Sequence, residues 1–174
     1  MYALTLANYV TLSRSALIPL IILFLFLGFN GLAVILFTIL WFSDIIDGYI
    51  ARRFNQVSDL GKFLDPLADK FLVILTLIAL VGLGKADSIP VIIITARELL
   101  VQSIRISSTK RSKKIIEAAP IAKLKATAQF VAVFMLILSI PYAHWILWVA
   151  VILSVFSGGT YLWQSKILKQ LKLS

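Results

Sequence analysis

The chain has 174 residues, of which 60% are hydrophobic, and its mean hydropathy of +0.98 excludes an ordinary soluble domain, whose apolar share is roughly half. Lysine and arginine outnumber aspartate and glutamate by 17 to 8, which in a membrane protein indicates topology and contact with anionic lipid headgroups rather than nucleic acid. The absence of cysteine excludes disulfides and thiolate chemistry. We therefore predict a single all-α integral membrane domain over residues 1–174.

Apolar runs that are long enough to cross a bilayer, about 20 residues each, recur along the chain. Several of these runs end at turn signals, such as Gly28-Phe29-Asn30-Gly31 after the first and Gly82-Leu83-Gly84 after the third. Residues 1–9 are expected to form a short interfacial helix before the first run. The six predicted transmembrane helices cover residues 10–29, 32–53, 58–83, 88–107, 120–140 and 144–163.

Cations are unevenly divided between the two sides of the predicted helix bundle. The loops on the side opposite to the termini hold only Lys85. Because cytoplasmic loops carry the excess of lysine and arginine, this asymmetry predicts that both termini and the connections 52–62 and 107–119 are cytoplasmic. These connections and the C-terminal tail carry Arg52, Arg53, Lys62, Lys110, Arg111, Lys113, Lys114, Lys166, Lys169 and Lys172.

Five of the eight acidic residues lie between Asp44 and Asp69, in a chain that is otherwise apolar. Asp44 and Asp47 are three residues apart, and Gly61, Asp65 and Asp69 repeat every four residues, so each set shares one face of its helix. Carboxylates within a span are costly, and four that face one another also repel. A cation must balance them, and ligation by oxygen alone suits Mg²⁺, Mn²⁺ or Ca²⁺. A pair of such ions is the arrangement used for phosphoryl displacement.

Small residues are interleaved with these aspartates. Gly48 and Ala51 lie on the face of Asp44, and Gly61 is in phase with Asp65. Small residues at four-residue spacing more often mark helix packing than a ligand site, and for these small residues alone packing is the preferred interpretation. That interpretation does not extend to the aspartates, because packing gains nothing from like charges.

Taken together, these residues resemble the full signature of the CDP-alcohol phosphatidyltransferase family, with every spacing kept over Asp44-x2-Asp47-Gly48-x2-Ala51-Arg52-x8-Gly61-x3-Asp65-x3-Asp69. The segment from Asn8 through Thr11 and Arg14 to Pro19 is similar to the N-terminal segment of that family. Within the family, the chain is most similar to the bacterial phosphatidylglycerophosphate synthases. This closer similarity lies in residues 61–70, in Ala96-Arg97-Glu98 with Arg105, and in Lys123-Leu124-Lys125 with Gln129.

Two departures from the pattern of those synthases bear on the acceptor and not on the chemistry. Ala122 and Ala126 flank the two lysines where the synthases usually have glycine and threonine. Thr160 stands where an acidic residue is common. The signature that includes the aspartates is unchanged.

The resemblance implies transfer of a phosphatidyl group from CDP-diacylglycerol to an alcohol, with release of CMP, at the cytoplasmic face of a bacterial cell membrane. It also implies a homodimer and two divalent cations, Mg²⁺ or Mn²⁺. One ion is expected on Asp44, Asp47 and Asp65, and the second on Asp44, Asp65 and Asp69. Asp69 is the expected general base, which takes the proton from the attacking hydroxyl. The residues expected to bind CDP-diacylglycerol are Gly48, Ala51, Arg52, Ser58 and Gly61, with Asn8 and Thr11 closing the pocket.

Four further cationic side chains indicate which alcohol accepts the phosphatidyl group. Arg97 and Arg105 lie within the span 88–107, and Lys123 and Lys125 open the next span. A buried arginine needs an anion or a water-filled cavity, and pairing of Arg97 with Glu98 is not expected because adjacent helical residues point apart. A phosphate on the acceptor would supply the anion, and sn-glycerol 3-phosphate carries one whereas serine does not. The sequence therefore predicts synthesis of phosphatidylglycerophosphate.

Three other readings stay open. The same chemistry could serve another acceptor, such as phosphatidylglycerol, an inositol phosphate or serine. A cation transporter is an alternative of a different class, because acidic residues within spans can line an ion path. Against it, the acids cluster at one end of the predicted spans, and Glu98 alone lies opposite them. A catalytically silent membrane scaffold is the third alternative, and the intact set of four aspartates argues against it.

Overall fold

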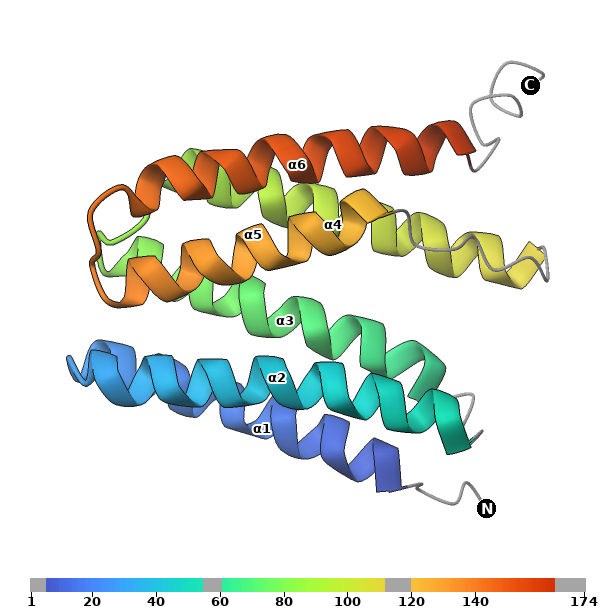
Figure 1. Cartoon of the computed structure of the whole chain (residues 1–174), viewed down its shortest axis with the longest axis horizontal. Helices are drawn as coiled ribbons and strands as arrows, with labels where there is room; N and C mark the ends of the chain where they lie inside the picture. The colour runs from blue at the N-terminus through green and yellow to red at the C-terminus, as the bar shows by residue number, and fades with distance from the viewer. Residues whose placement is uncertain (1–5, 55–60, 112–119, 165–174) are drawn as a thin grey trace.

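The computed structural model describes residues 6–54, 61–111 and 120–164, and within these ranges all regular secondary structure is helical, as expected. Consecutive helices run in opposite directions and form an elongated bundle (Figure 1). The six helices of the described ranges are α1 (Leu6–Phe26), α2 (Asn30–Phe54), α3 (Gly61–Gly82), α4 (Ser88–Arg111), α5 (Pro120–Ile137) and α6 (Ala143–Gln164).

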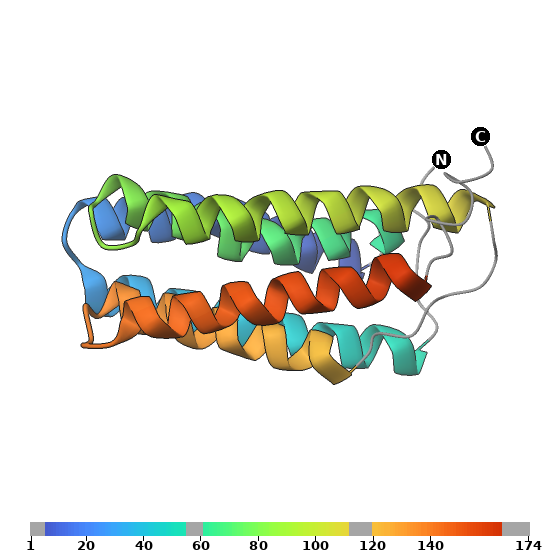
Figure 2. The same ribbon diagram turned by 90° about the horizontal axis from the view of Figure 1, so that it is seen from above.

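The helices are arranged in two layers (Figure 2). One layer holds α1, α3 and α4, with α3 between its neighbours, and the other holds α2, α5 and α6, with α5 between. Across the layers α1 packs on α2, α3 on α5 and α4 on α6. The first turns of α1, α3 and α5 and the last turns of α2, α4 and α6 share one end of the bundle, which we call the site end (Figure 1). The opposite end, the turn end, holds the connections 27–29, 83–87 and 138–142.

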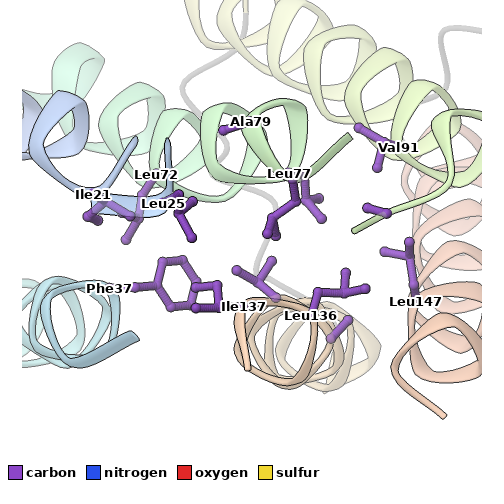
Figure 3. Packing of buried hydrophobic residues seen from close by; sticks show 14 of the residues in the cluster. Ile21, Leu25, Phe37, Leu72, Leu77, Ala79, Val91, Leu136, Ile137 and Leu147 are labelled. Atoms are coloured by element: carbon purple, nitrogen blue, oxygen red, sulfur yellow. The ribbon is translucent and has the colours of Figure 1, made fainter. Parts of the chain in front are cut away.

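The core lies between the two layers and consists of aliphatic and aromatic side chains. Ile21 of α1 and Leu72 and Leu77 of α3 point toward Phe37 of α2 and Ile137 of α5, and all of them are fully buried (Figure 3). Large apolar side chains are also exposed on the outer faces of the helices, far beyond what a soluble surface carries. Examples are Phe26, Ile35, Ile92, Leu100, Trp145 and Phe156. An apolar core with an apolar exterior is consistent with a protein of the membrane interior.

Among the residues that the structure describes, one helix is long and apolar enough to cross a membrane, over Ala143–Thr160 of α6. The stretches Ser15–Phe26, Asn30–Ser43 and Lys70–Gly82 are apolar but shorter. The helices predicted from the sequence are therefore present, whereas six membrane crossings stay a prediction.

The expected separate interfacial helix at residues 1–9 is wrong for residues 6–9. Helix α1 begins at Leu6 and continues without a break to Phe26, and residues 1–5 lie outside the described part. The reason is that no glycine or proline interrupts residues 6–18, so nothing stops the helix there. Pro19 is accommodated inside α1.

The turn end is closed by backbone hydrogen bonds and by one lysine. Gly28 and Gly84 have φ angles of 79° and 69°, the left-handed conformation with which helices commonly end. Lys85 Nζ donates to Asn30 Oδ1 at 2.9 Å and to the Ile137 carbonyl at 3.2 Å. We call this the Lys85 clamp, because it joins the start of α2, the turn after α3 and the end of α5.

Candidate functional site

The four aspartates of the signature lie on two helices that contact each other. Asp44 and Asp47 belong to α2, and Asp65 and Asp69 belong to α3. The portions of α2 and α3 that carry them approach the site end of the bundle (Figure 1). Their side chains lie outside those that the structure describes, so the metal site stays a prediction. The helical periodicity on which that prediction depends is present in both helices.

The positions expected to bind CDP-diacylglycerol come from the same part of the fold. Helix α1, which packs on both α2 and α3, carries the two N-terminal positions. Ser58 lies outside the described residues, and the other side chains of this set are also outside those described. The helices place the set as follows: Asn8 and Thr11 in α1, Gly48, Ala51 and Arg52 in α2, and Gly61 at the start of α3.

The described side chains outside the aspartate signature offer no further metal site. The side chains that the structure describes form no group of three or more His, Cys, Asp or Glu that could hold a metal ion. Within that part of the molecule nothing competes with the aspartates of α2 and α3 as donors.

The described side chains do form a second polar site, centred on Glu98 of α4. This carboxylate is 4% exposed, and its Oε1 accepts from Lys125 Nζ at 2.5 Å and from Arg97 Nη1 at 3.1 Å. Lys70 Nζ lies 3.8 Å from Glu98 Oε2. One buried carboxylate therefore meets three cations, which come from α3, α4 and α5.

Neutral side chains complete this site. Gln129 Nε2 and Ser154 Oγ lie 3.3 Å and 3.4 Å from Glu98 Oε1, within hydrogen-bonding distance. Arg97 Nη2 donates to Ser157 Oγ at 3.1 Å, which adds a second contact to α6. We call the whole set the Glu98 cluster, and its members are Lys70, Arg97, Glu98, Lys125, Gln129, Ser154 and Ser157.

The Glu98 cluster carries more positive than negative charge. Three cations against one carboxylate leave an excess of two positive charges among the described members. Like charges held together away from water repel one another, and an anion that binds among them relieves that repulsion. The Lys70 side chain is 31% exposed, whereas those of Lys125 and Arg97 are 5% and 12% exposed. Lys70 is therefore the member of the cluster that is most open to solvent.

The expectation that Arg97 turns away from Glu98 is wrong. The rule that adjacent helical residues point apart concerns the directions of their Cα–Cβ bonds. Both side chains are long enough for their polar ends to meet at 3.1 Å after starting in different directions. Glu98 therefore supplies an anion for Arg97, and the need for an anion rests on the excess charge of the cluster and not on Arg97 alone.

Two of the four cations expected around the acceptor come together in the cluster, namely Arg97 and Lys125. Lys123 is exposed on α5, two residues before buried Lys125. The side chain of Arg105 lies outside those that the structure describes, although its position is in α4. For all four cations a contact with the acceptor stays a prediction.

The sequence did carry a signal for the residues of the cluster that were missed. Gln129 lies four residues after Lys125, which was predicted, and Ser154 and Ser157 are three apart on α6. Polar residues at helical spacing on apolar helices share one face and need partners when they are buried. Lys70 directly follows Asp69 in the sequence, and this adjacency to a predicted site residue was a signal for Lys70.

Comparison with known proteins gives the family. The model of the CDP-alcohol phosphatidyltransferases matches residues 4–156, which include the aspartates and almost the whole Glu98 cluster. The chain belongs to this family. Membership confirms the resemblance seen in the sequence and supports a CDP-diacylglycerol-dependent phosphatidyltransferase over a transporter or a scaffold.

Among curated CDP-alcohol phosphatidyltransferases, the chain is 38% identical to the CDP-diacylglycerol–glycerol-3-phosphate 3-phosphatidyltransferase of Bacillus subtilis, with 90% of this chain and 92% of that protein covered. It is 37% identical to the protein of the same name from Rickettsia bellii, with the same coverage. It is 34% identical to a probable phosphatidylglycerophosphate synthase of Mycobacterium tuberculosis, with 90% of this chain and 79% of that protein covered.

Proposed function

We propose that the protein transfers the phosphatidyl group of CDP-diacylglycerol to sn-glycerol 3-phosphate and so forms phosphatidylglycerophosphate and CMP. Membership of the family supports the donor and the chemistry. The names of relatives that are 37–38% identical over 90% of the chain support this acceptor. The observation that carries the choice of a phosphate-bearing acceptor is the excess positive charge of the Glu98 cluster.

The donor end of the reaction is assigned to α1–α3. The family uses divalent cations, and the aspartate positions suit them because they fall on two helices in contact and offer only oxygen ligands. We assign Asp44, Asp47 and Asp65 to one ion, and Asp44, Asp65 and Asp69 to the other. Two Mg²⁺ or Mn²⁺ ions there would neutralise the pyrophosphate and stabilise the charge that develops as the bond to CMP breaks.

The acceptor end of the reaction is assigned to the Glu98 cluster. Arg97 and Lys125 bind the phosphate of glycerol 3-phosphate, and Lys70 receives it at the exposed edge. A hydroxyl of the acceptor attacks the phosphorus of the phosphatidyl group, the bond from that phosphorus to CMP breaks, and Asp69 takes the hydroxyl proton. Lys70 directly follows Asp69 in α3. The same turn of this helix therefore carries the proposed base for the acceptor hydroxyl and a cation for the acceptor phosphate. Arg105 and Lys123 are further candidates for the phosphate.

The placement in the membrane follows from charge and surface. We propose that all six helices cross the cytoplasmic membrane of a bacterial cell, with both termini and the site end in the cytoplasm. The exposed apolar side chains on the outer faces of the bundle support contact with lipid. The donor lipid then enters from the bilayer while its CDP head lies at the cytoplasmic surface. A homodimer is proposed from the family resemblance alone.

A panel of acceptors tests this function. The purified full-length protein is supplied with CDP-diacylglycerol and Mg²⁺, and release of CMP is measured with glycerol 3-phosphate, phosphatidylglycerol, an inositol phosphate or serine. We expect the highest kcat/KM with glycerol 3-phosphate. A higher kcat/KM with serine would contradict the role given to the Glu98 cluster, because serine brings no phosphate.

A further inference from the structure

The Arg97 guanidinium is held from two helices at once. Its Nη1 donates to Glu98 on its own helix, α4, and its Nη2 donates to Ser157 on α6, each at 3.1 Å. Its Nε is buried and has no hydrogen-bond partner among the described residues. The two contacts fix the plane of the guanidinium, because they engage both terminal nitrogens of one rigid group.

Gly158 provides the space in which the Arg97 side chain lies. A Cβ built on Gly158 would be 2.9 Å from Arg97 Nε and 3.4 Å from Arg97 Cγ. Side chains do not approach that closely, so any residue larger than glycine would push Arg97 aside. The next residue, Gly159, is different, since a Cβ there meets nothing within 4 Å. The two glycines form a matched pair, in which only one is required by Arg97.

Glu98 holds Arg97 and Lys125 together by charge. Both cations contact the same oxygen, Oε1, and both side chains are almost fully buried. Without the carboxylate the two like charges would repel each other in a site that water screens poorly. A shared oxygen also fixes how far apart the two cations stand, and two cations near one point suit a phosphate, which has several oxygens to engage.

We propose that Glu98 and Gly158 are positioning residues for the acceptor: Glu98 keeps Arg97 and Lys125 side by side, and Gly158 lets Arg97 reach its place against α6. This inference rests on the proposed function, in which these two cations bind the acceptor phosphate. Neither positioning residue contacts the acceptor, so each acts only through Arg97 or Lys125.

Alanine substitutions at Gly158 and Gly159 test whether Gly158 positions Arg97 for the acceptor. Gly158→Ala and Gly159→Ala are purified as full-length proteins, and CMP release is measured against the concentration of glycerol 3-phosphate and, separately, of CDP-diacylglycerol. For Gly158→Ala we expect the KM for glycerol 3-phosphate to rise on the order of tenfold, because a charge-assisted contact to phosphate is misaligned. The KM for CDP-diacylglycerol and the Tm should stay near wild type, since a flexible side chain can move aside without disturbing the fold. Gly159→Ala should match wild type in all three measurements.

A second pair keeps the inference testable if Gly158→Ala does not fold. Glu98→Gln removes the charge and keeps the shape, whereas Glu98→Asp keeps the charge. We expect Glu98→Gln to raise the KM for glycerol 3-phosphate, and Glu98→Asp to restore most of the loss. A lower Tm in Glu98→Gln with an unchanged KM for the acceptor would overturn the inference and leave the cluster a structural ion pair.

Failure of the proposed function is distinguishable from failure of this inference. If the wild type prefers an inositol phosphate to glycerol 3-phosphate, the proposed function fails, and the same variants decide the inference through the KM for the inositol phosphate. If the wild type accepts only alcohols without a phosphate, both fail. Equal KM values for the preferred phosphate-bearing acceptor in wild type, Gly158→Ala and Glu98→Gln would overturn the inference alone.

Discussion

Lys85 and Glu98 are the centres of two polar clusters among the described side chains, and the two differ in how their charge is balanced. Lys85 donates to two neutral oxygens, on Asn30 and Ile137, and stays half-buried at the turn end. Glu98 is buried and meets the cations Arg97 and Lys125, with Lys70 at the edge. The Lys85 clamp joins the start of α2, the turn after α3 and the end of α5, and so stabilises the fold. Among the described side chains, the Glu98 cluster has two more positive than negative charges.

The difference teaches how a structural polar cluster can be told from a binding one. A cluster that serves the fold satisfies its groups with each other and with water. Lys85 also has no anionic partner among its described contacts, but it is half-buried, so water can solvate its charge. A cluster that serves a ligand keeps charge where water does not reach it. Among the described side chains the Glu98 cluster has two more positive than negative charges, and Arg97 and Lys125 are almost fully buried. We propose that the aspartates of α2 and α3 also belong to the binding class, with the opposite sign of charge.

Removal of divalent metal gives the largest expected effect. If the aspartates keep a reserve of negative charge for metal ions, a chelator should abolish CMP release, and Mg²⁺ or Mn²⁺ should restore it. The measurement is turnover of CDP-diacylglycerol with glycerol 3-phosphate before and after chelation. Full activity in metal-free protein would remove the aspartates from the binding class.

Asp69→Asn gives the next largest effect. Loss of a general base should lower kcat by roughly 10²–10⁴-fold, while the affinity for CDP-diacylglycerol stays largely intact. The matched control is Asp87→Asn at the turn end, where Asp87 Oδ2 lies 3.1 Å from His144 Nδ1 and both side chains are exposed. Asp87→Asn should keep the kcat of wild type. A kcat near wild type in Asp69→Asn would exclude Asp69 as the base.

Lys125→Met tests directly whether the excess positive charge of the Glu98 cluster binds the acceptor phosphate. It removes a cation from the Glu98 cluster and keeps the length of the side chain, so the KM for glycerol 3-phosphate should rise roughly 10- to 100-fold. The KM for CDP-diacylglycerol should change little. An unchanged KM for the acceptor would place the Glu98 cluster in the same class as the Lys85 clamp.

Lys85→Met is the reciprocal change and has the smallest effect on catalysis. Loss of the contacts to Asn30 and Ile137 should lower the Tm by about 3–8 °C, whereas kcat and both KM values stay unchanged. Thermal unfolding and the same CMP assay check the two halves of this expectation. A raised KM for the acceptor in Lys85→Met would mean that the two clusters are not independent.

Much of the fold was predictable, because the length of apolar runs and the position of turn signals are local properties of the sequence. The turns at Gly28 and Gly84 are examples, since glycine tolerates the positive φ angles found there. The start of α1 was not predicted, because a few polar residues suggested a boundary where no helix breaker stands. Six membrane crossings, by contrast, concern the surroundings of the chain and stay a prediction.

The candidate site was predictable to the extent that it depends on spacing within one helix. Asp44 with Asp47, and Asp65 with Asp69, were found in this way, and membership of the family confirms the resemblance that they carry. Of the Glu98 cluster only Arg97 and Lys125 were predicted to lie in one site, because the cluster joins four helices and its contacts span up to 60 residues of sequence. Only the packing of α3, α4, α5 and α6 brings those residues together.

The division of the two sites between the halves of the chain has an evolutionary consequence. The residues assigned to the donor lie within residues 8–69, and the Glu98 cluster, apart from Lys70, lies in α4–α6. A lineage could therefore alter its acceptor through mutations in the second half while selection keeps the first half constant. Lys70 is the exception, because it stands beside Asp69 and is constrained by both sites. Exchange of α4–α6 between relatives with different acceptors would preserve the chemistry only where the incoming half accommodates this lysine.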